Sequence, residues 1–307
     1  MEVRHEPVLL RETLRFLLGG PGLYLDATLG DGGHALAVLD AEPGARLLGC
    51  DRDPAALQCA GERLARFGDR VMLRHAAFSQ LPDAHRDAGG EPFTGALFDF
   101  GLSSRQIDDA GRGISFTHDG PLDMRMDPTS GEPLVARLAH AEESEVAQAL
   151  REHGDVRGAA RLARALVMAA SAGQLGTTRQ LAALAGRVLA DSRPKALAPV
   201  FQALRIWVND EMHEVDAALA WLPVAMRDGG TAVTLAYHSG EDRRVKHVLR
   251  GAQGVSVSRR RPVMDDGTAA GPWEELTRRV VVPSDEEQQG NPRARSARLR
   301  AFRRKPR

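Results

Sequence analysis

The sequence predicts an α/β protein in which a parallel sheet is interrupted by an inserted all-helical domain. Between residues 23 and 99, four short apolar runs, three of which end in a carboxylate, alternate with stretches of helical spacing. Residues 133–198 are then rich in Ala, Leu, Arg and Glu at helical spacing, and strand patterning resumes at residues 231–237 and 277–282. Strands that alternate with helices are typical of parallel sheets with right-handed crossovers.

The first part of the chain contains four strand candidates and one clear helix. The strand candidates are residues 23–26, 46–50, 71–73 and 95–98. Residues 54–67 have apolar residues at helical spacing, and Pro54 suits the first helical turn. Ligands of open α/β sheets bind outside the carboxyl ends of the strands, where we expect a glycine-rich turn, Asp51 and Asp99 to gather.

The second part contains the helical insert and a return to the sheet. Candidate helices are residues 142–153, 159–172, 178–189 and 201–226, and residues 284–292 are expected to form a polar loop or linker. An all-helical block inside an α/β pattern indicates an inserted domain. We therefore expect a discontinuous sheet domain at residues 1–108 and 199–307, with the helical domain at residues 109–198.

Composition excludes several classes of protein. The 307 residues are 43% hydrophobic, with a mean hydropathy of −0.30, and they contain no apolar run of about 18 residues that could form a transmembrane helix. The first eleven residues lack the apolar core of a signal peptide. Cys50 and Cys59 are too few for a disulfide framework or a four-cysteine zinc site. A reduced cytoplasmic protein is expected.

Charge is distributed unevenly along the chain. Residues 291–307 hold eight basic residues and no acidic one, so residues 1–290 carry a net charge of about −8. A basic tail on an acidic body suggests a contact with a polyanion, and a disordered solubilising tail is an equal alternative.

A glycine-rich turn after the first strand candidate suggests a nucleotide-type ligand. It reads Asp26-Ala27-Thr28-Leu29-Gly30-Asp31-Gly32-Gly33-His34, which is not the G-x-G-x-x-G spacing of dinucleotide sites and disfavours an NAD-linked dehydrogenase. Its glycines allow close approach of the backbone and offer amide donors to a carboxylate. Asp51, after the second strand, suits two ribose hydroxyls. A tight turn and a helix-capping Asp would explain either feature alone, whereas the pair favours S-adenosylmethionine.

Asp99 closes the fourth strand, at the edge that faces the transferred group in such folds. An exocyclic amine is a weak nucleophile because its lone pair is delocalised into the ring. A carboxylate that accepts its N–H bonds localises that pair, and it also favours a neighbouring sulfonium charge. Methylation of a pyrimidine at carbon-5 would instead need a thiol nucleophile, and neither cysteine is well placed. The sequence therefore favours nitrogen as the acceptor atom.

Several motifs occur in order along nearly the whole chain. The most specific is Gly120-Pro121-Leu122-Asp123-Met124-Arg125-Met126-Asp127; the others are residues 5–10, 26–34, 51–54, 99–109, 112–116, 201–209, 238–239, 241–243 and 291–296. In these motifs the chain resembles the bacterial 16S rRNA cytosine-N4 methyltransferases, the RsmH or MraW family. Arg105 and Gly240 depart from the family pattern, where proline and leucine are usual, which puts the local loop geometry in question.

The resemblance implies a class I (Rossmann-like) methyltransferase fold with S-adenosylmethionine as the methyl donor. The acceptor it implies is N4 of one cytidine in the decoding region of 16S rRNA, in the small ribosomal subunit. By motif, the cofactor contacts are Gly32, Gly33, His34, Asp51, Phe78, Asp99 and Gln106. Phe78 would neighbour the adenine or pack in the core. Transfer would be direct and in line, with Asp99 and Ser104 as candidates for orienting the amine.

Basic residues are the candidates for RNA contacts. They are Arg205, Arg243, Arg293 and Arg295, and the 291–296 motif with the tail is the preferred backbone contact. Arg259-Arg260-Arg261 would extend this surface or form a solvated loop. Arg205 and Trp207 are expected on a helix that packs on the sheet, with Trp207 in the core. The target base must leave its stack, and the helical insert would form the second wall of the cleft.

A histidine near the end of the chain invites a metal interpretation, which we reject. His238 stands close to Glu241 and Asp242, but Ser239 and Asp242 have the spacing of a capping box for the helix that follows. No metal is expected. His238 would lie at the carboxyl end of a strand, where it is a candidate for contact with the target cytidine.

Two other functions are weighed against this one. A DNA cytosine-N4 or adenine-N6 methyltransferase would carry a Pro-Pro-aromatic motif after the fourth strand, which residues 100–102 do not match. An RNA-binding assembly factor without catalysis would be favoured by loss of the glycine-rich turn or of Asp51, and both are present. No membrane contact is expected, and the sequence leaves a monomer and a homodimer equally open.

Overall fold

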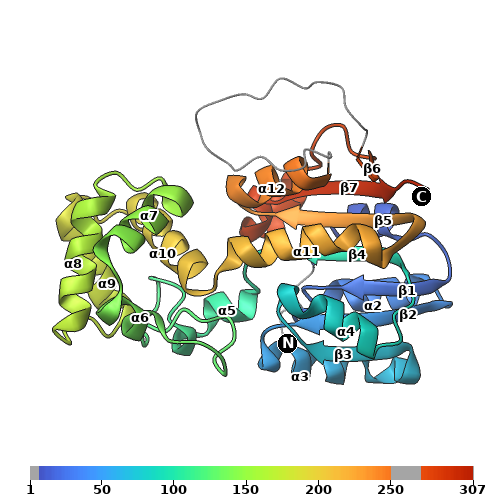
Figure 1. Ribbon diagram of the computed structural model, residues 1–307, viewed down its shortest axis with the longest axis horizontal. Coiled ribbons are helices and arrows are strands. Elements are labelled where there is room, and N and C mark those ends of the chain that lie inside the picture. Colours follow the sequence, from blue (N-terminus) through green and yellow to red (C-terminus); the bar gives the residue numbers. More distant parts are fainter. Residues whose placement is uncertain (1–6, 250–270, 307) are drawn as a thin grey trace. The chain divides into compact units, whose positions relative to one another are not determined.

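The computed structural model describes residues 7–249 and 271–306, and the chain divides into two compact units (Figure 1). The sheet unit comprises residues 1–101 and 213–307, and the helical unit comprises residues 102–212. The helical unit is longer at both ends than the expected insert, 109–198. The difference at its end arises because α10 (Pro194–Val208) buries Phe201 and Leu204 in the core of the helical unit.

The described strands form one seven-stranded sheet in the order β3-β2-β1-β4-β5-β7-β6. They are β1 (Gly22–Asp26), β2 (Ala45–Asp51), β3 (Val71–His75), β4 (Phe93–Asp99), β5 (Met226–Ala236), β6 (Trp273–Glu275) and β7 (Arg298–Arg304). The first five are parallel, as expected, whereas β7 is antiparallel to β5 and β6 is antiparallel to β7. The order reverses between β1 and β4, and ligands of such sheets bind at this switch point.

Helices cover both faces of the sheet (Figure 1). On one face, α4 (Leu81–Asp87), α11 (Glu211–Ala225) and α12 (Ser239–Leu249) contribute to a core that includes Phe98. On the other face, α1 (Leu10–Leu17), α2 (Gly33–Ala41) and α3 (Pro54–Leu64) contribute to a core that includes Leu97. Neighbouring residues of β4 thus point to opposite cores, as expected for a sheet buried on both faces. No helix in the described part of the chain is long and apolar enough to span a membrane.

The basic C-terminal residues form an inner strand, so the alternative of a disordered solubilising tail is wrong for residues 298–304. β7 lies between β5 and β6, and Leu299 and Phe302 are fully buried. Arg300 is 8% exposed, and its guanidinium donates to Asp242 of α12 at 2.7 and 3.2 Å. Burial of the apolar residues therefore outweighs the high charge of this segment.

Two further predictions near the C-terminus are wrong. The strand expected at residues 277–282 does not form, because the Thr277 hydroxyl accepts the N–H of Ala301 at 3.0 Å where a strand would offer a carbonyl. Val281 makes only an isolated bridge with Leu299. The expected loop at 284–292 instead contains α13 (Asp285–Gly290), which Ser284 caps through the N–H of Glu287 at 3.1 Å.

The helical unit agrees with the sequence prediction over residues 142–189. It contains α5 (Ser104–Asp108), α6 (Leu134–His140), α7 (Glu143–Gly154), α8 (Ala159–Ser171), α9 (Thr178–Leu189) and α10. Helices α7, α8 and α9 agree with the expected ranges. The single helix expected at 201–226 is instead α10 and α11, because the intervening Asp210 has a left-handed φ of 49°.

Asn209 connects the end of α10 to the Asp123–Asp127 motif. Its side-chain oxygen accepts the N–H of Met126 at 2.7 Å, and its side-chain nitrogen donates to the carbonyl of Met124 at 2.8 Å. Asn209 is 4% exposed, and Met124 is fully buried with a φ of 60°, which is uncommon for a residue other than glycine. The side chain of Asn209 thus stabilises a backbone turn that the chain would not adopt by itself.

Replacing Asn209 with alanine is expected to destabilise the helical unit by about 2–4 kcal/mol. The change leaves the buried N–H of Met126 and the carbonyl of Met124 without their partner. Urea unfolding followed by circular dichroism measures the effect. Gln148→Ala is the control, since Gln148 bonds Glu152 on the exposed side of α7 and is expected to change stability by less than about 0.5 kcal/mol. Equal losses in the two variants would contradict this role of Asn209.

Candidate functional site

Three carboxylates stand at the carboxyl edge of the sheet, because Asp26, Asp51 and Asp99 each end a strand. Burial is the largest cause that raises their pKa values, to about 7 for Asp26 and Asp99 and to about 6 for Asp51. The charges of Asp51 and Asp99 further raise the pKa of Asp26. A cationic ligand would favour the ionised forms of all three, and the sulfonium and ammonium groups of S-adenosylmethionine fit this requirement.

Asp51 ties the glycine-rich turn to the end of β2. Its Oδ2 accepts the N–H of Gly30 at 2.8 Å, and its Oδ1 accepts the N–H of Asp53 at 2.8 Å. Gly30 and Gly32 have φ values of 50° and 75°, in the left-handed region that favours glycine. The cap of α3 is Asp53, whose side chain accepts the N–H of Ala55. Because each carboxylate oxygen can accept two hydrogen bonds, Asp51 is able to hold this turn and ribose hydroxyls together.

Gly33 and His34 form the first turn of α2. A Cβ atom placed on Gly33 would lie 2.5 Å from Cγ of Pro7, so no larger residue fits. His34 is 7% exposed, and burial lowers its pKa to about 4. Its Nε2 lies 3.7 Å from Oδ2 of Asp99. Among the described residues neither ring nitrogen has a hydrogen-bond partner, so a neutral imidazole is available to a ligand.

At the switch point, the carboxylate of Asp99 is only partly hydrogen-bonded by the described residues. The N–H of Asp99 donates to Oγ1 of Thr28 at 2.7 Å. Burial raises the pKa of the Asp99 carboxylate, whereas the neighbouring Tyr237 hydroxyl lowers it. Its Oδ1 is buried and has no hydrogen-bond partner within residues 7–249 and 271–306. The side chain as a whole is 23% exposed. Buried carboxylate oxygens are normally paired, so this atom indicates where a ligand donor belongs.

Phe78 lies at the border of one core cluster. Its ring packs edge-to-face against Phe98 and Phe100, with centroids 5.8 Å away in both cases. These contacts support the packing interpretation. Because Phe78 is only partly buried, its contact with the adenine stays a prediction.

His238 stands directly after Tyr237 at the carboxyl end of β5, and both of its ring nitrogens face groups of its own turn. Its Nδ1 accepts the N–H of Gly240 at 3.2 Å, and its Nε2 lies 3.0 Å from Oε1 of Glu241. The expected capping box is wrong, because Glu241 accepts the N–H groups of Tyr237 and His238 while Asp242 binds Arg300. Contact between His238 and a cytidine stays a prediction.

Three further candidates belong to the helical unit. Ser104 begins α5, and Gln106 completes a capping box in which its Oε1 accepts the N–H of Ser103 at 3.1 Å. Arg205 makes a bidentate ion pair with Glu211 at 2.7 and 2.9 Å, and its side chain is only 12% exposed. Ser104 and Gln106 stay predictions for the site. The buried pair does not support an RNA contact by Arg205.

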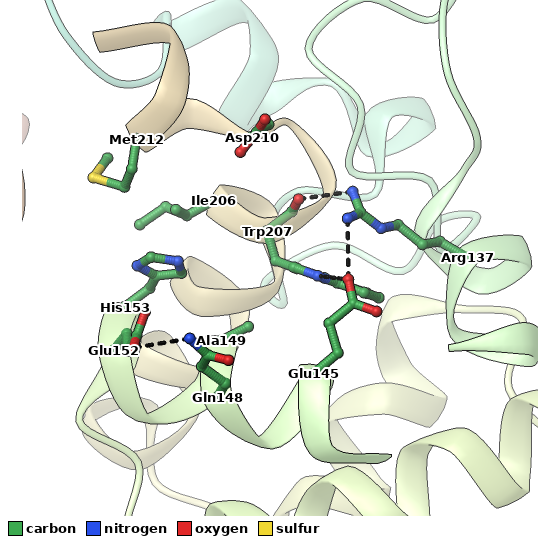
Figure 2. A pocket seen from close by; sticks show the side chains of 10 residues that line it. All are labelled: Arg137, Glu145, Gln148, Ala149, Glu152, His153, Ile206, Trp207, Asp210 and Met212. Atoms are coloured by element: carbon green, nitrogen blue, oxygen red, sulfur yellow. Dashed lines mark hydrogen bonds and ion pairs between the residues drawn. The ribbon is translucent and has the colours of Figure 1, made fainter. Parts of the chain in front are cut away.

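A cavity of about 270 Å³ lies within the helical unit, and Figure 2 shows Trp207, Arg137 and Glu145 on its wall. The Trp207 indole N–H donates to Glu145 at 2.8 Å, and the Arg137 guanidinium lies 4.1 Å from the centre of the Trp207 ring system. Trp207 is 8% exposed and belongs to the core of this unit. Its expected core role is confirmed, whereas the expected packing of its helix on the sheet is wrong.

Clusters that could bind a metal ion are absent from the described part of the chain. No group of three or more His, Cys, Asp or Glu side chains there has an arrangement that could hold a metal ion. Arg259-Arg260-Arg261, His5 and Glu6 lie outside the described residues.

Comparison with known proteins settles the family. A model of the MraW methylase family matches residues 2–305. The chain belongs to this family. It is 42% identical over 306 residues to a ribosomal RNA small subunit methyltransferase H of Sorangium cellulosum, covering 98% of this chain and 91% of that protein. It is 44% identical over 306 residues to the Nitratidesulfovibrio vulgaris protein of the same name, covering 97% and 94%.

Solved structures add little to this assignment. An rRNA methylase from Streptococcus thermophilus gives a TM-score of 0.43 at 10% identity over the full length of both chains. TrmN from Thermus thermophilus gives 0.45 at 12% identity, covering 99% of this chain and 51% of that one. The family and the observed sheet confirm the expected class I methyltransferase fold, with S-adenosylmethionine as methyl donor.

Three site groups received no role in the sequence analysis. Asp26 carried a usable signal, since it ends its strand as Asp51 and Asp99 do. Tyr237 and Glu241 carried none, because their roles depend on the turn between β5 and α12.

Proposed function

We propose that this methylase transfers a methyl group from S-adenosylmethionine to N4 of one cytidine in the decoding region of 16S rRNA. The observation that supports this most directly is the buried Oδ1 of Asp99 at the switch point of the sheet, which has no hydrogen-bond partner in the part of the chain that the structure describes. The small ribosomal subunit as partner is supported by the names of relatives that match nearly the whole chain. The proposed setting is the cytoplasm, where the subunit is assembled.

The residues of the site suit a direct transfer. S-adenosylmethionine supplies an electrophilic methyl group when it is bound. The proposed role of Asp99 is to accept an N–H of the amine, which localises the lone pair, while its charge favours the cationic donor. The proposed role of Asp51 is to hold the ribose, and the proposed role of the Gly32–Gly33 turn is a backbone contact with the methionine half. The spare amine proton passes to water or a nearby acceptor after transfer.

The cysteines support nitrogen rather than carbon as the methylated atom. Carbon-5 methylation requires a thiolate nucleophile. Cys50 is fully buried, and burial raises the pKa of its thiol to about 12, so the thiolate is not available. Cys59 is partly buried within α3.

The proposed RNA surface of the sheet unit consists of Arg243, Arg293 and Arg295. Arg243 lies on the exposed side of α12, and the other two are exposed on the short helix at Pro292–Ser296. Residues 298–304 contribute less than the sequence suggested, because Arg300 and Arg304 are buried in β7. The proposed backbone contact therefore centres on the 291–296 motif and α12, while Arg298 and Arg303 stay exposed on β7.

The double variant Arg243→Ala/Arg295→Ala is expected to weaken binding to small-subunit rRNA and to reduce the slope of log K against log salt by about 2. Each lost phosphate contact removes about one released counterion. Filter binding at several salt concentrations measures both quantities. Arg86→Ala is the control, since Arg86 is exposed on α4 and pairs with Asp83. An unchanged salt slope in the double variant would remove these arginines from the interface.

The substrate class is tested by supplying labelled S-adenosylmethionine together with rRNA-containing subunits or with DNA. We expect label in the RNA fraction that ribonuclease releases and none in DNA. Label in DNA would favour the DNA methyltransferase alternative. Tight donor binding without transfer to either polymer would favour the assembly factor.

A further inference from the structure

Thr28 attaches the glycine-rich turn to the end of β4. Its Oγ1 accepts the N–H of Asp99 at 2.7 Å. Strands β1 and β4 are neighbours, and their main-chain bonds extend to the one from the N–H of Ala27 to the carbonyl of Leu97, at 3.0 Å. The hydroxyl of Thr28 therefore continues the link between the two strands by one side chain, where β1 has already ended.

The other side of the turn after β4 is held by the main chain alone. There the N–H of Phe100 donates to the carbonyl of Leu235 in β5 at 2.9 Å. A main-chain carbonyl is present whatever the residue, whereas the acceptor on the β1 side belongs to the side chain of Thr28. The position of the Asp99 backbone thus depends on the residue type at position 28.

The glycine-rich turn is attached to strands on both of its sides. From β2, Oδ2 of Asp51 accepts the N–H of Gly30 at 2.8 Å, and towards β4 the attachment is the bond between Thr28 and Asp99. The turn leads to His34, whose Nε2 lies 3.7 Å from Oδ2 of Asp99. Both ring nitrogens of His34 and Oδ1 of Asp99 are buried without a hydrogen-bond partner among the described residues. Thr28 therefore joins the two segments that carry these polar atoms.

We propose that Thr28 is a positioning residue of the methyl-donor site, whose hydroxyl holds the backbone of Asp99 against the glycine-rich turn and so sets the place of the Asp99 carboxylate. This inference rests on the proposed placement of the donor and the amine beside Asp99. A displaced carboxylate no longer holds the amine in line with the methyl group. Misplacement by about 1 Å at a reacting centre lowers a rate by about 10²-fold.

Thr28→Val tests this role, because valine keeps nearly the shape of threonine but cannot accept the N–H of Asp99. The single-turnover rate of transfer from labelled S-adenosylmethionine to small ribosomal subunits that lack the methyl group is expected to fall by about 10- to 100-fold. The affinity for S-adenosylhomocysteine, measured by calorimetry, is expected to stay within about threefold, because the bonds of Asp51 to the turn remain. Thr28→Ser keeps the acceptor oxygen and is expected to bring the rate back to within about threefold of the wild type.

Thr277→Val is the matched control. The Thr277 hydroxyl also accepts the N–H of a strand residue, Ala301 of β7, at 3.0 Å, and Thr277 is 4% exposed. This variant loses the same kind of bond in the same unit, and its transfer rate is expected to stay within about twofold of the wild type because β5 separates β7 from β4. Equal rate losses in the two valine variants would overturn the role of Thr28. So would a loss of S-adenosylhomocysteine affinity as large as the loss of rate, or a Thr28→Ser rate as low as that of Thr28→Val.

A double-mutant cycle with Asp99→Asn distinguishes failure of this role from failure of the proposed function. Because Thr28 acts through Asp99, Thr28→Val is expected to slow transfer by less than about threefold further when Asp99→Asn is already present. The same loss in both backgrounds, or a wild-type rate in Thr28→Val while Asp99→Asn is slow, overturns the role of Thr28 alone. A wild-type rate in Asp99→Asn overturns the placement of the donor and the amine together with that role. If Thr28→Val does not fold, Thr28→Ala carries the same expectations.

Discussion

Asp99→Asn is expected to lower the rate of methyl transfer at saturating substrates by about 10²–10³-fold, the largest functional loss among the variants considered. Asparagine keeps the size of the side chain but removes the negative charge and one acceptor oxygen, and loss of one preorganised electrostatic group at a reacting centre has an effect of this size. Single-turnover transfer from labelled donor measures the rate.

The matched control for Asp99→Asn is Asp83→Asn. Asp83 has a carboxylate that is 69% exposed and pairs with Arg86 on the surface of α4. Its loss is expected to leave the transfer rate within about twofold, because exposed ion pairs contribute little. In the wild-type protein the transfer rate is expected to fall as the pH drops below the pKa of Asp99, because the carboxylate becomes protonated. A rate in Asp99→Asn within tenfold of the wild type would contradict a direct role of this residue.

Asp242→Ala is expected to lower the free energy of unfolding of the sheet unit by about 3–5 kcal/mol, the largest expected structural loss. The change leaves the Arg300 guanidinium without its bidentate partner at 8% exposure, and an unpaired buried charge is strongly destabilising. Glu275 lies 3.6 Å from the same guanidinium and limits the loss. Urea unfolding measures the change.

Glu274→Ala provides the control for this buried pair. Glu274 of β6 pairs with Arg303, which lies on β7 as Arg300 does, but the side chains of Glu274 and Arg303 are both about half exposed. Its loss is expected to change stability by less than about 1 kcal/mol. Similar losses in Asp242→Ala and Glu274→Ala would show that burial of the Arg300 pair is not what stabilises β7.

The candidate carboxylates could be predicted because their position depends on local pattern alone. An apolar run that ends in a carboxylate and is followed by a helix places that carboxylate at the carboxyl edge of a parallel sheet. Asp26, Asp51 and Asp99 satisfy this rule. Gly30 and Gly32 in the turn after β1 have positive φ values, as the glycine pattern of that turn suggests. The helices α7, α8 and α9 were predictable for the same reason, since each has a continuous period of its own.

The remaining features depend on distant partners, and a local pattern does not contain them. The charge of residues 298–304 suggested a tail because Arg300 finds its partner, Asp242, far away in the sequence. The turn of the Asp123–Asp127 motif depends on Asn209, which lies far away in the sequence and bonds Met124 and Met126. Likewise, the turn after β5 is held by Glu241 rather than by the Ser239 and Asp242 pair that has the capping spacing.

The most direct test of the proposed function is nucleoside mass spectrometry of 16S rRNA after methyl transfer. Small ribosomal subunits that lack the modification would be incubated with the protein and labelled S-adenosylmethionine, and the labelled nucleoside would be mapped to its position. The proposed function predicts N4-methylated cytidine at one site in the decoding region, lost in Asp99→Asn. Label on another base, on another atom of cytidine, or outside the decoding region would contradict it.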